Sequence, residues 1–418
     1  MWKQVSEDFW KENRASKVGD VSDAVSGIIG EVRAGGDKAL FELTKKFDRQ
    51  EIGRLEVTRE EIEDAYDSVD QEIVDELENA AFNIERFHEM QVPPDMWLRE
   101  VEPGITLGVK STPLERVGCY VPGGRASYPS TALMCIIPAR VAGVGEIICC
   151  TPAPVNPATL VAMDIAGADK IFKIGGAQAV AAMALGTVNV PKVQKIVGPG
   201  NVYVTAAKMI LRNEVEIDFP AGPSEIGVLA DSGAACEYLA ADLIAQAEHD
   251  PSSASILITD DPELPGLVWE AMEHMIDDQP RKSIILKALE NSGYILAEDM
   301  DEAVEMMNRI APEHLSIQTS DPMATLSKVR NAGSIFVGPY TPVAAGDYAS
   351  GTNHVLPTAG NSSTASGLNV SHFRKTSTVQ MLTREGLEAL APTIEVLSTS
   401  EGLHAHCDSV RVRFDDAE

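Results

Sequence analysis

Short apolar runs alternate with helical segments of about 10–15 residues through the middle of this chain. In the first series, residues 146–151 (EIICCT) have the pattern of a buried strand and residues 156–168 that of a helix. A second series, from 225–230 to 334–337, repeats the alternation. Strands joined through helices run parallel, and the helices cover both faces of the sheet. The pattern therefore predicts an α/β fold with two parallel α/β units.

The predicted architecture is two Rossmann-like but incomplete α/β domains with helical N-terminal and C-terminal extensions. The first hundred residues show apolar side chains at helical spacing, with charged residues between them. A stretch rich in Gly, Ser, Thr and Asn begins at Gly346 and predicts a functional loop. The last segment has too few apolar residues to fold alone, so we expect it to dock on another surface. The predicted parts are 1–103 (helical, part of which could join the second α/β domain), 104–223 (first α/β domain), 224–345 (second α/β domain), 346–378 (active-site loop region) and 379–418 (C-terminal helical segment).

The charge of the chain limits its partners. Its 418 residues include 34 Lys and Arg against 63 Asp and Glu, which gives a net charge of −29. Nucleic acid and anionic membrane surfaces both require a basic face, so neither is an expected partner. The N-terminus lacks the apolar core of a secretory signal, and the most apolar stretch, 131–155, is interrupted by charges and prolines. Six scattered cysteines without CxxC spacing indicate a cytoplasmic protein.

Polar side chains that can do chemistry gather in the second half of the chain. Gln246 and His249 leave the same face of a predicted helix, which suits either two metal ligands or a polar helix end. Glu313 and His314 stand just before a predicted strand. They are either an acid–base pair or polar residues that simply face solvent. The Gly-rich loop and the C-terminal end, where fraying is the alternative, supply the remaining candidates. These are Asp347, His354, His404 and His406.

Two further chemistries have weaker sequence signals. A cysteine nucleophile would have to be Cys119, because the neighbouring cysteines lie inside apolar runs and are expected to pack as small hydrophobes. Residues 175–179 (GGAQA) and 198–201 (GPGN) each follow a predicted strand and open a helix, as phosphate-binding loops do. Neither has GxGxxG spacing, and after GPGN Tyr203 stands where the third glycine belongs. These segments allow a nucleotide site but do not form a standard Rossmann fingerprint.

Nine motifs stand in order along the chain: ERVGCYVPGG, YPSTALM, GGAQAVAAMALGT, KIVGPGN, DFPAGPSEIGVLAD, DLIAQAEHDP, NRIAPEHLSI, GDYASGTNHVLPT and EGLHAH. Together they resemble the histidinol dehydrogenase family, zinc-dependent enzymes that end histidine biosynthesis. The resemblance extends from about the first predicted helix to the last. It implies an NAD-dependent enzyme that oxidises L-histidinol to L-histidine through L-histidinaldehyde, with two NAD consumed.

The resemblance also implies a role for individual residues. It implies one Zn²⁺ per subunit, held by Gln246, His249, Asp347 and His406, the last donated across a homodimer by the partner subunit. Glu313 and His314 match the catalytic pair of the family. Substrate contacts are implied for Ser224, His354 and Glu401 besides His314 and the zinc ligands, and NAD contacts for Tyr120, Gln178 and Asn201. His404 matches no ligand of the family, and the family does not use the position of Cys119 for catalysis.

These residue types suit the implied chemistry. One amide, one carboxylate and two imidazoles suit Zn²⁺, whose main task would be to orient L-histidinol. A neutral His314 would take the hydroxyl proton as hydride leaves, and Glu313 would activate water to hydrate the aldehyde. Because the chain is acidic, we expect backbone N–H groups at GGAQ and GPGN to hold the pyrophosphate of NAD. The alternatives are a zinc hydrolase with Glu313 as the base and a metal- or metabolite-binding protein without activity.

Overall fold

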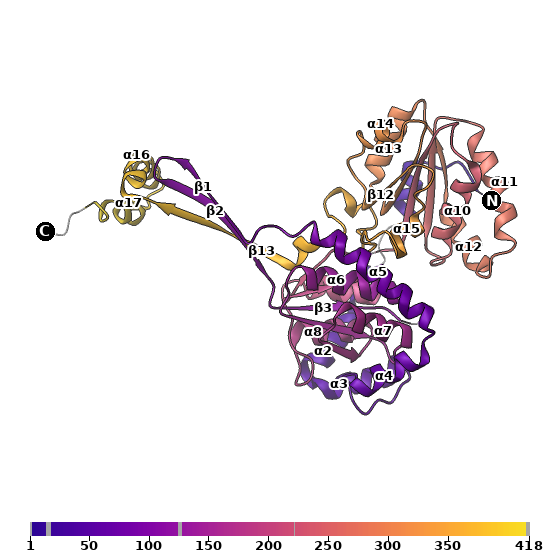
Figure 1. The fold of residues 1–418 in the computed structure, drawn as a ribbon, viewed down its shortest axis with the longest axis horizontal. Helices are drawn as coiled ribbons and strands as arrows, with labels where there is room; N and C mark the ends of the chain where they lie inside the picture. The colour runs from indigo at the N-terminus through magenta and orange to yellow at the C-terminus, as the bar shows by residue number, and fades with distance from the viewer. Residues whose placement is uncertain (1, 14–17, 124–127, 221, 415–418) are drawn as a thin grey trace. The chain divides into compact units, whose positions relative to one another are not determined.

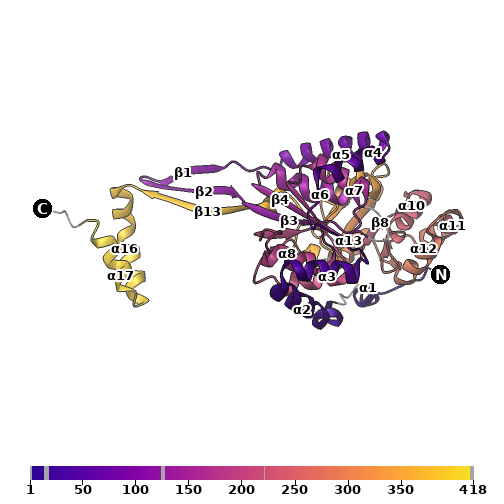
Figure 2. The same ribbon diagram turned by 90° about the horizontal axis from the view of Figure 1, so that it is seen from below.

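The chain folds into two compact units. The structure is a computed structural model, and it describes residues 2–13, 18–123, 128–220 and 222–414. The larger unit consists of Met1–Gln91 and Leu114–Phe373, and the smaller unit of Val92–Pro113 and Arg374–Glu418. The larger unit contains two five-stranded sheets with their helices (Figure 1, Figure 2). The predicted α/β class, with two parallel α/β domains, is confirmed.

The first sheet consists of five parallel strands in the order β5-β4-β3-β6-β7. Its side chains alternate between two apolar cores: Ile147 and Cys149 belong to one, and Ile148 and Cys150 to the other. Helices α4 (Arg59–Ser68), α5 (Gln71–Glu89), α6 and α7 cover one face. Helices α2 (Val18–Gly35), α3 (Asp37–Phe47), α8 and α9 cover the opposite face. The strands are β3 (Arg116–Tyr120), β4 (Glu146–Thr151), β5 (Lys170–Lys173), β6 (Lys195–Val197) and β7 (Glu216–Ile217), and the crossover helices are α6 (Pro129–Val141), α7 (Pro157–Ala166), α8 (Gly176–Leu185) and α9 (Val202–Ile210).

Helices of the N-terminal region are divided between the two α/β domains. Helix α4 begins at a capping box, in which Thr58 and Glu61 each bond the backbone N–H of the other residue. Helix α1 packs on the second domain instead, where Trp10 is buried in the core that contains Leu315 and Ile317. The helices are α1 (Glu7–Asn13), α2 (Val18–Gly35), α3 (Asp37–Phe47), α4 (Arg59–Ser68) and α5 (Gln71–Glu89).

The second sheet is also parallel, with the strand order β10-β9-β8-β11-β12. Its central strands are buried on both faces and are nearly continuous runs of apolar residues. Although these runs are apolar, no helix anywhere in the described ranges is long and apolar enough to cross a membrane.

The strands of the second sheet are β8 (Glu225–Ala230), β9 (Ala254–Thr259), β10 (Gly293–Leu296), β11 (His314–Gln318) and β12 (Ser334–Val337). The helices are α10 (Cys236–Ala247), α11 (Leu264–Ile276), α12 (Lys282–Ala288), η1 (Leu289–Asn291), α13 (Met300–Ile310), α14 (Pro322–Leu326) and α15 (Val343–Tyr348).

The Gly-rich segment after α15 contacts both α/β domains. Val355 and Phe373 are buried in a core of the first domain, whereas the Ala359 N–H donates to the Glu225 side chain on β8 at 3.1 Å. Two short 3-10 helices lie within the segment, η2 (Asn361–Ser363) and η3 (Val370–Phe373). The predicted loop is therefore an ordered connection whose backbone lies beside strands of the second sheet.

The smaller unit differs from the predicted secondary structure. Its three-stranded antiparallel sheet has the order β1-β2-β13, where a helical region up to residue 103 and a helical segment from 379 were expected. Few of its strand residues are buried in this chain, so the sequence lacks the hydrophobic alternation that would indicate strands. The elements are β1 (Met96–Glu102), β2 (Ile105–Pro113), β13 (Arg374–Leu382), α16 (Arg384–Ser400) and α17 (His404–Arg411).

Candidate active site

The adjacent Glu313 and His314 lie at the start of β11, between β8 and β12. His314 pairs in register with Ile226 on one side and with Ser334 on the other. The residues that precede the other central strands are therefore brought to the same amino-terminal edge of the sheet, including Ser224 before β8. The pair is almost completely buried, so it is not simple surface polarity.

Hydrogen bonds fix both side chains against β8. The Glu225 N–H donates to Glu313 Oε2 at 2.9 Å, and His314 Nδ1 lies 3.2 Å from the Glu225 carbonyl oxygen. A carbonyl oxygen can only accept, so Nδ1 carries a proton and donates. His314 Nε2 then faces Asp347, with Oδ1 at 3.7 Å. The imidazole is thus oriented with its second nitrogen toward the carboxylate of α15.

Burial and neighbouring charges shift the pKa values of this group. Burial raises the pKa of Glu313 to about 8, although His314 and the Glu225 N–H oppose the rise. Burial alone would lower the pKa of His314, but the charges of Glu313 and Asp347 raise it to about 9. Conversely, His314 keeps the pKa of Asp347 below its usual value despite burial of that carboxyl group. The neighbouring carboxyl groups therefore favour the protonated form of His314 in the metal-free chain.

Gln246 and His249, at the end of α10, supply the other predicted ligands. Gln246 is 2% exposed, yet its Oε1 and Nε2 have no hydrogen-bond partner among the described residues. His314 Nε2 is another buried atom without such a partner. Leaving buried amide groups unpaired costs free energy, so a ligand for them is expected. His249 is exposed and lies close enough to Asp347 for their charges to interact.

His354 connects the Gly-rich segment to this group. Its Nδ1 lies 2.9 Å from the carbonyl oxygen of Asp347, and its Nε2 lies 3.4 Å from Thr131 Oγ1 on α6. The half-buried Ser224 stands one residue before Glu225, whose N–H and carbonyl oxygen hold the Glu313 and His314 side chains. Sequence reasoning missed Glu225 as a support for the catalytic pair. A charged residue that opens the otherwise apolar, buried segment EIGVLA is the signal that could have identified it.

The last predicted ligand, His406, belongs to the smaller unit, as do Glu401, a predicted substrate contact, and His404, whose role was left open. Glu401 follows α16, and His404 and His406 lie in the first turn of α17. All three side chains are exposed. Within the described ranges, no three His, Cys, Asp or Glu side chains are grouped as a metal site requires.

A thiol nucleophile at Cys119 is excluded by its surroundings. Cys119 is fully buried on β3, and its Sγ donates to the Cys135 carbonyl oxygen at 3.6 Å. The neighbouring Cys149 thiol and burial raise its pKa well above the usual value. A nucleophile must be reached by substrate and must ionise, and this thiol does neither.

The residues expected to contact NAD lie after strands of the first sheet, at its carboxyl edge. Tyr120 ends β3, and its hydroxyl accepts the Gly176 N–H at 3.0 Å. Gln178 is buried in the first turn of α8. Asn201 is the N-cap of α9, where its Oδ1 accepts the N–H groups of Tyr203 at 3.0 Å and Val204 at 3.2 Å.

Hydrogen bonds within the chain occupy part of the GPGN loop, whose amides were expected to bind pyrophosphate. Gly198 N–H donates to Asp218 Oδ2 at 2.8 Å, and Asn201 caps the first turn of the helix that follows. The first turn of α8 is the better candidate for binding the pyrophosphate, because the N–H groups of Ala177 and Gln178 have no acceptor within the helix.

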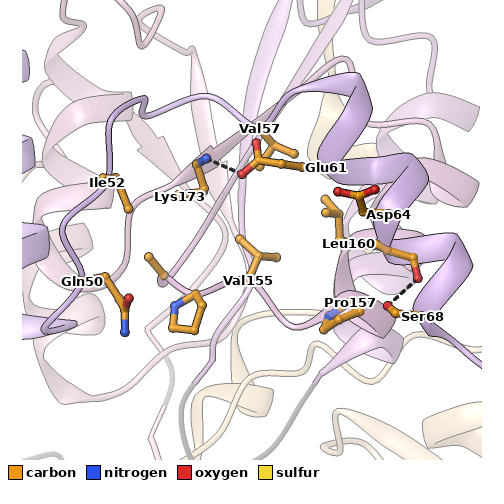
Figure 3. A pocket seen from close by; sticks show the side chains of 13 residues that line it. Gln50, Ile52, Val57, Glu61, Asp64, Ser68, Val155, Pro157, Leu160 and Lys173 are labelled. Atoms are coloured by element: carbon orange, nitrogen blue, oxygen red, sulfur yellow. Dashed lines mark hydrogen bonds and ion pairs between the residues drawn. The ribbon is translucent and has the colours of Figure 1, made fainter.

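A hollow of about 400 Å³ lies elsewhere on the first domain (Figure 3). It is lined by α4 and by residues that follow β4, and an ion pair between Lys173 Nζ and Glu61 Oε1, 2.6 Å apart, lies at its side. None of the predicted catalytic, ligand or NAD residues lines this hollow. It therefore does not mark the site formed at β11 and α10.

Comparisons with known proteins match the chain over nearly its whole length. The family model described as histidinol dehydrogenase matches residues 11–414. The histidinol dehydrogenase of Methanosarcina barkeri is 51% identical over 406 residues, which cover 96% of this chain and 94% of that protein. The histidinol dehydrogenase of Halobacterium salinarum is 48% identical over 407 residues, covering 96% and 95%. A crystal structure of histidinol dehydrogenase from Elizabethkingia anophelis superposes with a TM-score of 0.94 at 38% identity, covering 99% of this chain and 97% of that one.

Proposed function

Because the chain belongs to the histidinol dehydrogenase family, we propose that it oxidises L-histidinol to L-histidine through L-histidinaldehyde, using two NAD, at the end of histidine biosynthesis. Two observations support this most directly: the group of Glu313, His314 and Asp347, and the buried amide of Gln246 on α10, which has no hydrogen-bond partner among the described residues. Glu313 and His314 are acid–base groups, and the side-chain oxygens of Asp347 and Gln246 are atoms that can bind a cation. Bound NAD would supply the hydride acceptor for each oxidation.

The donor set fits Zn²⁺. We propose that Gln246, His249 and Asp347 hold the ion together with His406 of the partner subunit. The buried Gln246 Oε1 has no partner in the described chain, and a cation would satisfy it. When bound, Zn²⁺ would supply a Lewis-acid anchor that orients the imidazole and the amine of L-histidinol.

The side chains of β11 would then move the protons. His314 would accept the hydroxyl proton as the alcohol is oxidised, through the nitrogen that is not bonded to Glu225. Glu313 would take a proton from the water that hydrates the aldehyde, and His314 would act again in the second oxidation. A cation that balances the charge of Asp347 would weaken the field that raises the pKa of His314, so metal binding would leave its imidazole ready to act as a base.

The surface of the smaller unit supports a homodimer. All seven residues of β1 are exposed in this chain, and several large apolar side chains lie on the surface of this unit. Exposed apolar surface of this kind is typical of an interface. These side chains are Met96, Trp97, Leu98, Val101, Met381, Leu382, Val396, Leu397 and Leu403. A dimer built here would cover them and would bring Glu401 and His406 of the partner subunit to each site, where Glu401 would contact the substrate.

The test is to mix the zinc-loaded protein with L-histidinol and NAD and to follow NADH absorbance, with two NADH expected per L-histidinol. His314→Ala should lower kcat by about 10²–10⁴-fold while zinc content stays unchanged, because His314 moves a proton and is not a ligand. The matched control is His274→Ala, an exposed histidine on α11 outside the site.

Two outcomes would contradict the proposal. If L-histidinol and NAD yield no NADH with the zinc-loaded protein, the dehydrogenase assignment fails and a zinc hydrolase with Glu313 as the base becomes the better explanation. If His314→Ala loses zinc in parallel with activity, His314 is a ligand and not a base.

A further inference from the structure

A buried ion pair lies under the GPGN segment of the first domain. Lys208 on α9 and Asp218 after β7 approach to 2.5 Å, with side chains that are 3% and 1% exposed. The other Lys and Arg ion pairs among the described residues leave at least one partner far more exposed. Removing two charges from water costs free energy. A contribution to the stability of the fold therefore does not by itself explain a buried ion pair at this position.

The hydrogen bonds of the pair hold both polar groups of Gly198. Lys208 Nζ donates to the Gly198 carbonyl oxygen at 2.8 Å, and the Gly198 N–H donates to Asp218 Oδ2 at 2.8 Å. The second oxygen, Asp218 Oδ1, accepts the Phe219 N–H at 2.8 Å. The pair therefore determines where two backbone segments lie, the GPGN loop and the start of the segment that leads to Ser224.

Gly198 in turn packs against Tyr120. Its φ is +112°, and a Cβ added there would collide with the carbonyl oxygen of Tyr120. The Tyr120 hydroxyl accepts the Gly176 N–H, so the same contacts reach the first turn of α8. Asn201 stands three residues after Gly198. Of the three proposed NAD residues, Tyr120 thus packs against the glycine that the ion pair holds, and Asn201 follows that glycine closely in sequence. Gln178 lies two residues after Gly176, whose N–H the Tyr120 hydroxyl accepts.

A direct contact between Lys208 and the cofactor does not fit this geometry. Its ammonium group is paired with Asp218 and bonded to Gly198, and the side chain is 3% exposed. The paired charges also cancel, so the pair adds no positive potential for the pyrophosphate. The action on the cofactor must therefore pass through the backbone that the pair holds in place.

We propose that Lys208 and Asp218 are positioning residues for NAD, which act by fixing the GPGN loop against Tyr120. This inference rests on the proposed function, because it assumes that Tyr120, Gln178 and Asn201 contact NAD. It assigns a role in cofactor affinity to two residues that touch neither substrate nor cofactor.

The experiment compares the variants Lys208→Met and Lys208→Met/Asp218→Asn with the wild type as zinc-loaded protein. The single variant leaves a buried carboxylate without its cation and is expected to be strongly destabilised, whereas the double variant is neutral and should fold. We expect the double variant to raise the KM for NAD by about tenfold or more, with less than about threefold change in the KM for L-histidinol and no loss of zinc. Direct titration of NAD in the absence of L-histidinol should show the same loss of affinity.

The control is a second ion pair at the opposite edge of the same sheet. Lys170 Nζ and Glu146 Oε1 are 2.8 Å apart, at the first residues of β5 and β4. Lys170→Met/Glu146→Gln should leave both KM values within about twofold of the wild type.

Three results would overturn the inference. The first is a folded double variant that keeps the wild-type KM for NAD. The second is an equal rise in both KM values together with loss of zinc, which would show general loosening of the fold. The third is a control pair with the same loss of NAD affinity. Failure of the proposed function is distinguishable, because the wild type itself would then produce no NADH.

Discussion

At the scale of single residues, Asp242 is a carboxyl group whose burial costs free energy, yet it connects parts of the site. It lies on α10 one helical turn before Gln246 and is 7% exposed. The Ser316 hydroxyl on β11 and the Val343 N–H at the start of α15 both stabilise its carboxylate. The same carboxylate therefore joins the three elements that carry Gln246, His314 and Asp347.

Replacement of Asp242 by Asn should stabilise the fold in a pH-dependent way. Burial raises the pKa of Asp242 from 3.8 to about 6, so the ionised group destabilises the folded state above pH 6. This rise in pKa corresponds to about 3 kcal/mol at neutral pH, which is the upper limit of the expected gain in the free energy of unfolding. The gain should shrink as pH falls from 6 toward 4, because the folded protein then protonates the carboxylate. Urea unfolding of the metal-free protein from pH 4 to 8 checks this, and a gain independent of pH would contradict it.

At the scale of elements, the starts of helices carry much of the proposed cofactor site. Asn201 is the N-cap of α9 and Gly175 is the N-cap of α8, each in the loop that leaves a strand of the first sheet. The Asn201 side chain uses its oxygen to cap α9, so its amide nitrogen is the group left for a ligand. A structural role and a binding role thus reside on different atoms of one residue.

Two substitutions separate these roles of Asn201. Asn201→Ala should cost about 1 kcal/mol of stability, because α9 loses its cap, and should weaken NAD affinity. Asn201→Ser keeps an oxygen that can cap the helix but lacks the amide nitrogen. We expect Asn201→Ser to retain most of the stability and to show the same rise in the KM for NAD as Asn201→Ala. If Asn201→Ser instead restores NAD affinity, the residue acts only through the start of the helix. Thermal unfolding and steady-state kinetics measure the two effects separately.

At the scale of the whole molecule, the larger unit holds all the proposed site residues except Glu401 and His406. Those two lie in the smaller unit, in which most side chains of the strands are exposed in a single chain. A unit with so little buried surface of its own gains stability from a partner. Assembly and catalysis are therefore expected to depend on the same surface.

Complementation between inactive subunits tests this dependence. His406→Ala and His249→Ala should each lose zinc and activity when pure. After unfolding and refolding of an equal mixture, random pairing should place one intact site in each mixed dimer, which restores about one quarter of the wild-type activity. A mixture that exchanges subunits and remains inactive would show that each site is built within one chain. The double variant His249→Ala/His406→Ala, mixed with His406→Ala, serves as the control, because no pairing of these chains gives an intact site.

Much of the larger unit could be predicted from the chain alone. The periodicity of residues 104–345 predicts both parallel sheets, since buried strands and crossover helices have local sequence patterns. The motifs predicted Glu313 and His314 as an acid–base pair, and the structure buries them side by side at β11. The support given by Glu225 and Asp242 was not predicted, because which buried polar groups meet depends on how distant strands and helices pack.

The sequence by itself determined the α/β class, the order of strands and helices in the larger unit, and the family to which the chain belongs. Only the tertiary structure decided that β2 pairs with β13 more than 250 residues away, and that the amide of Gly198 is held by Asp218. The physical reason is the range of the interactions. Helical and strand periodicity is written in neighbouring residues, whereas strand pairing and the satisfaction of buried polar groups join residues that only folding brings together.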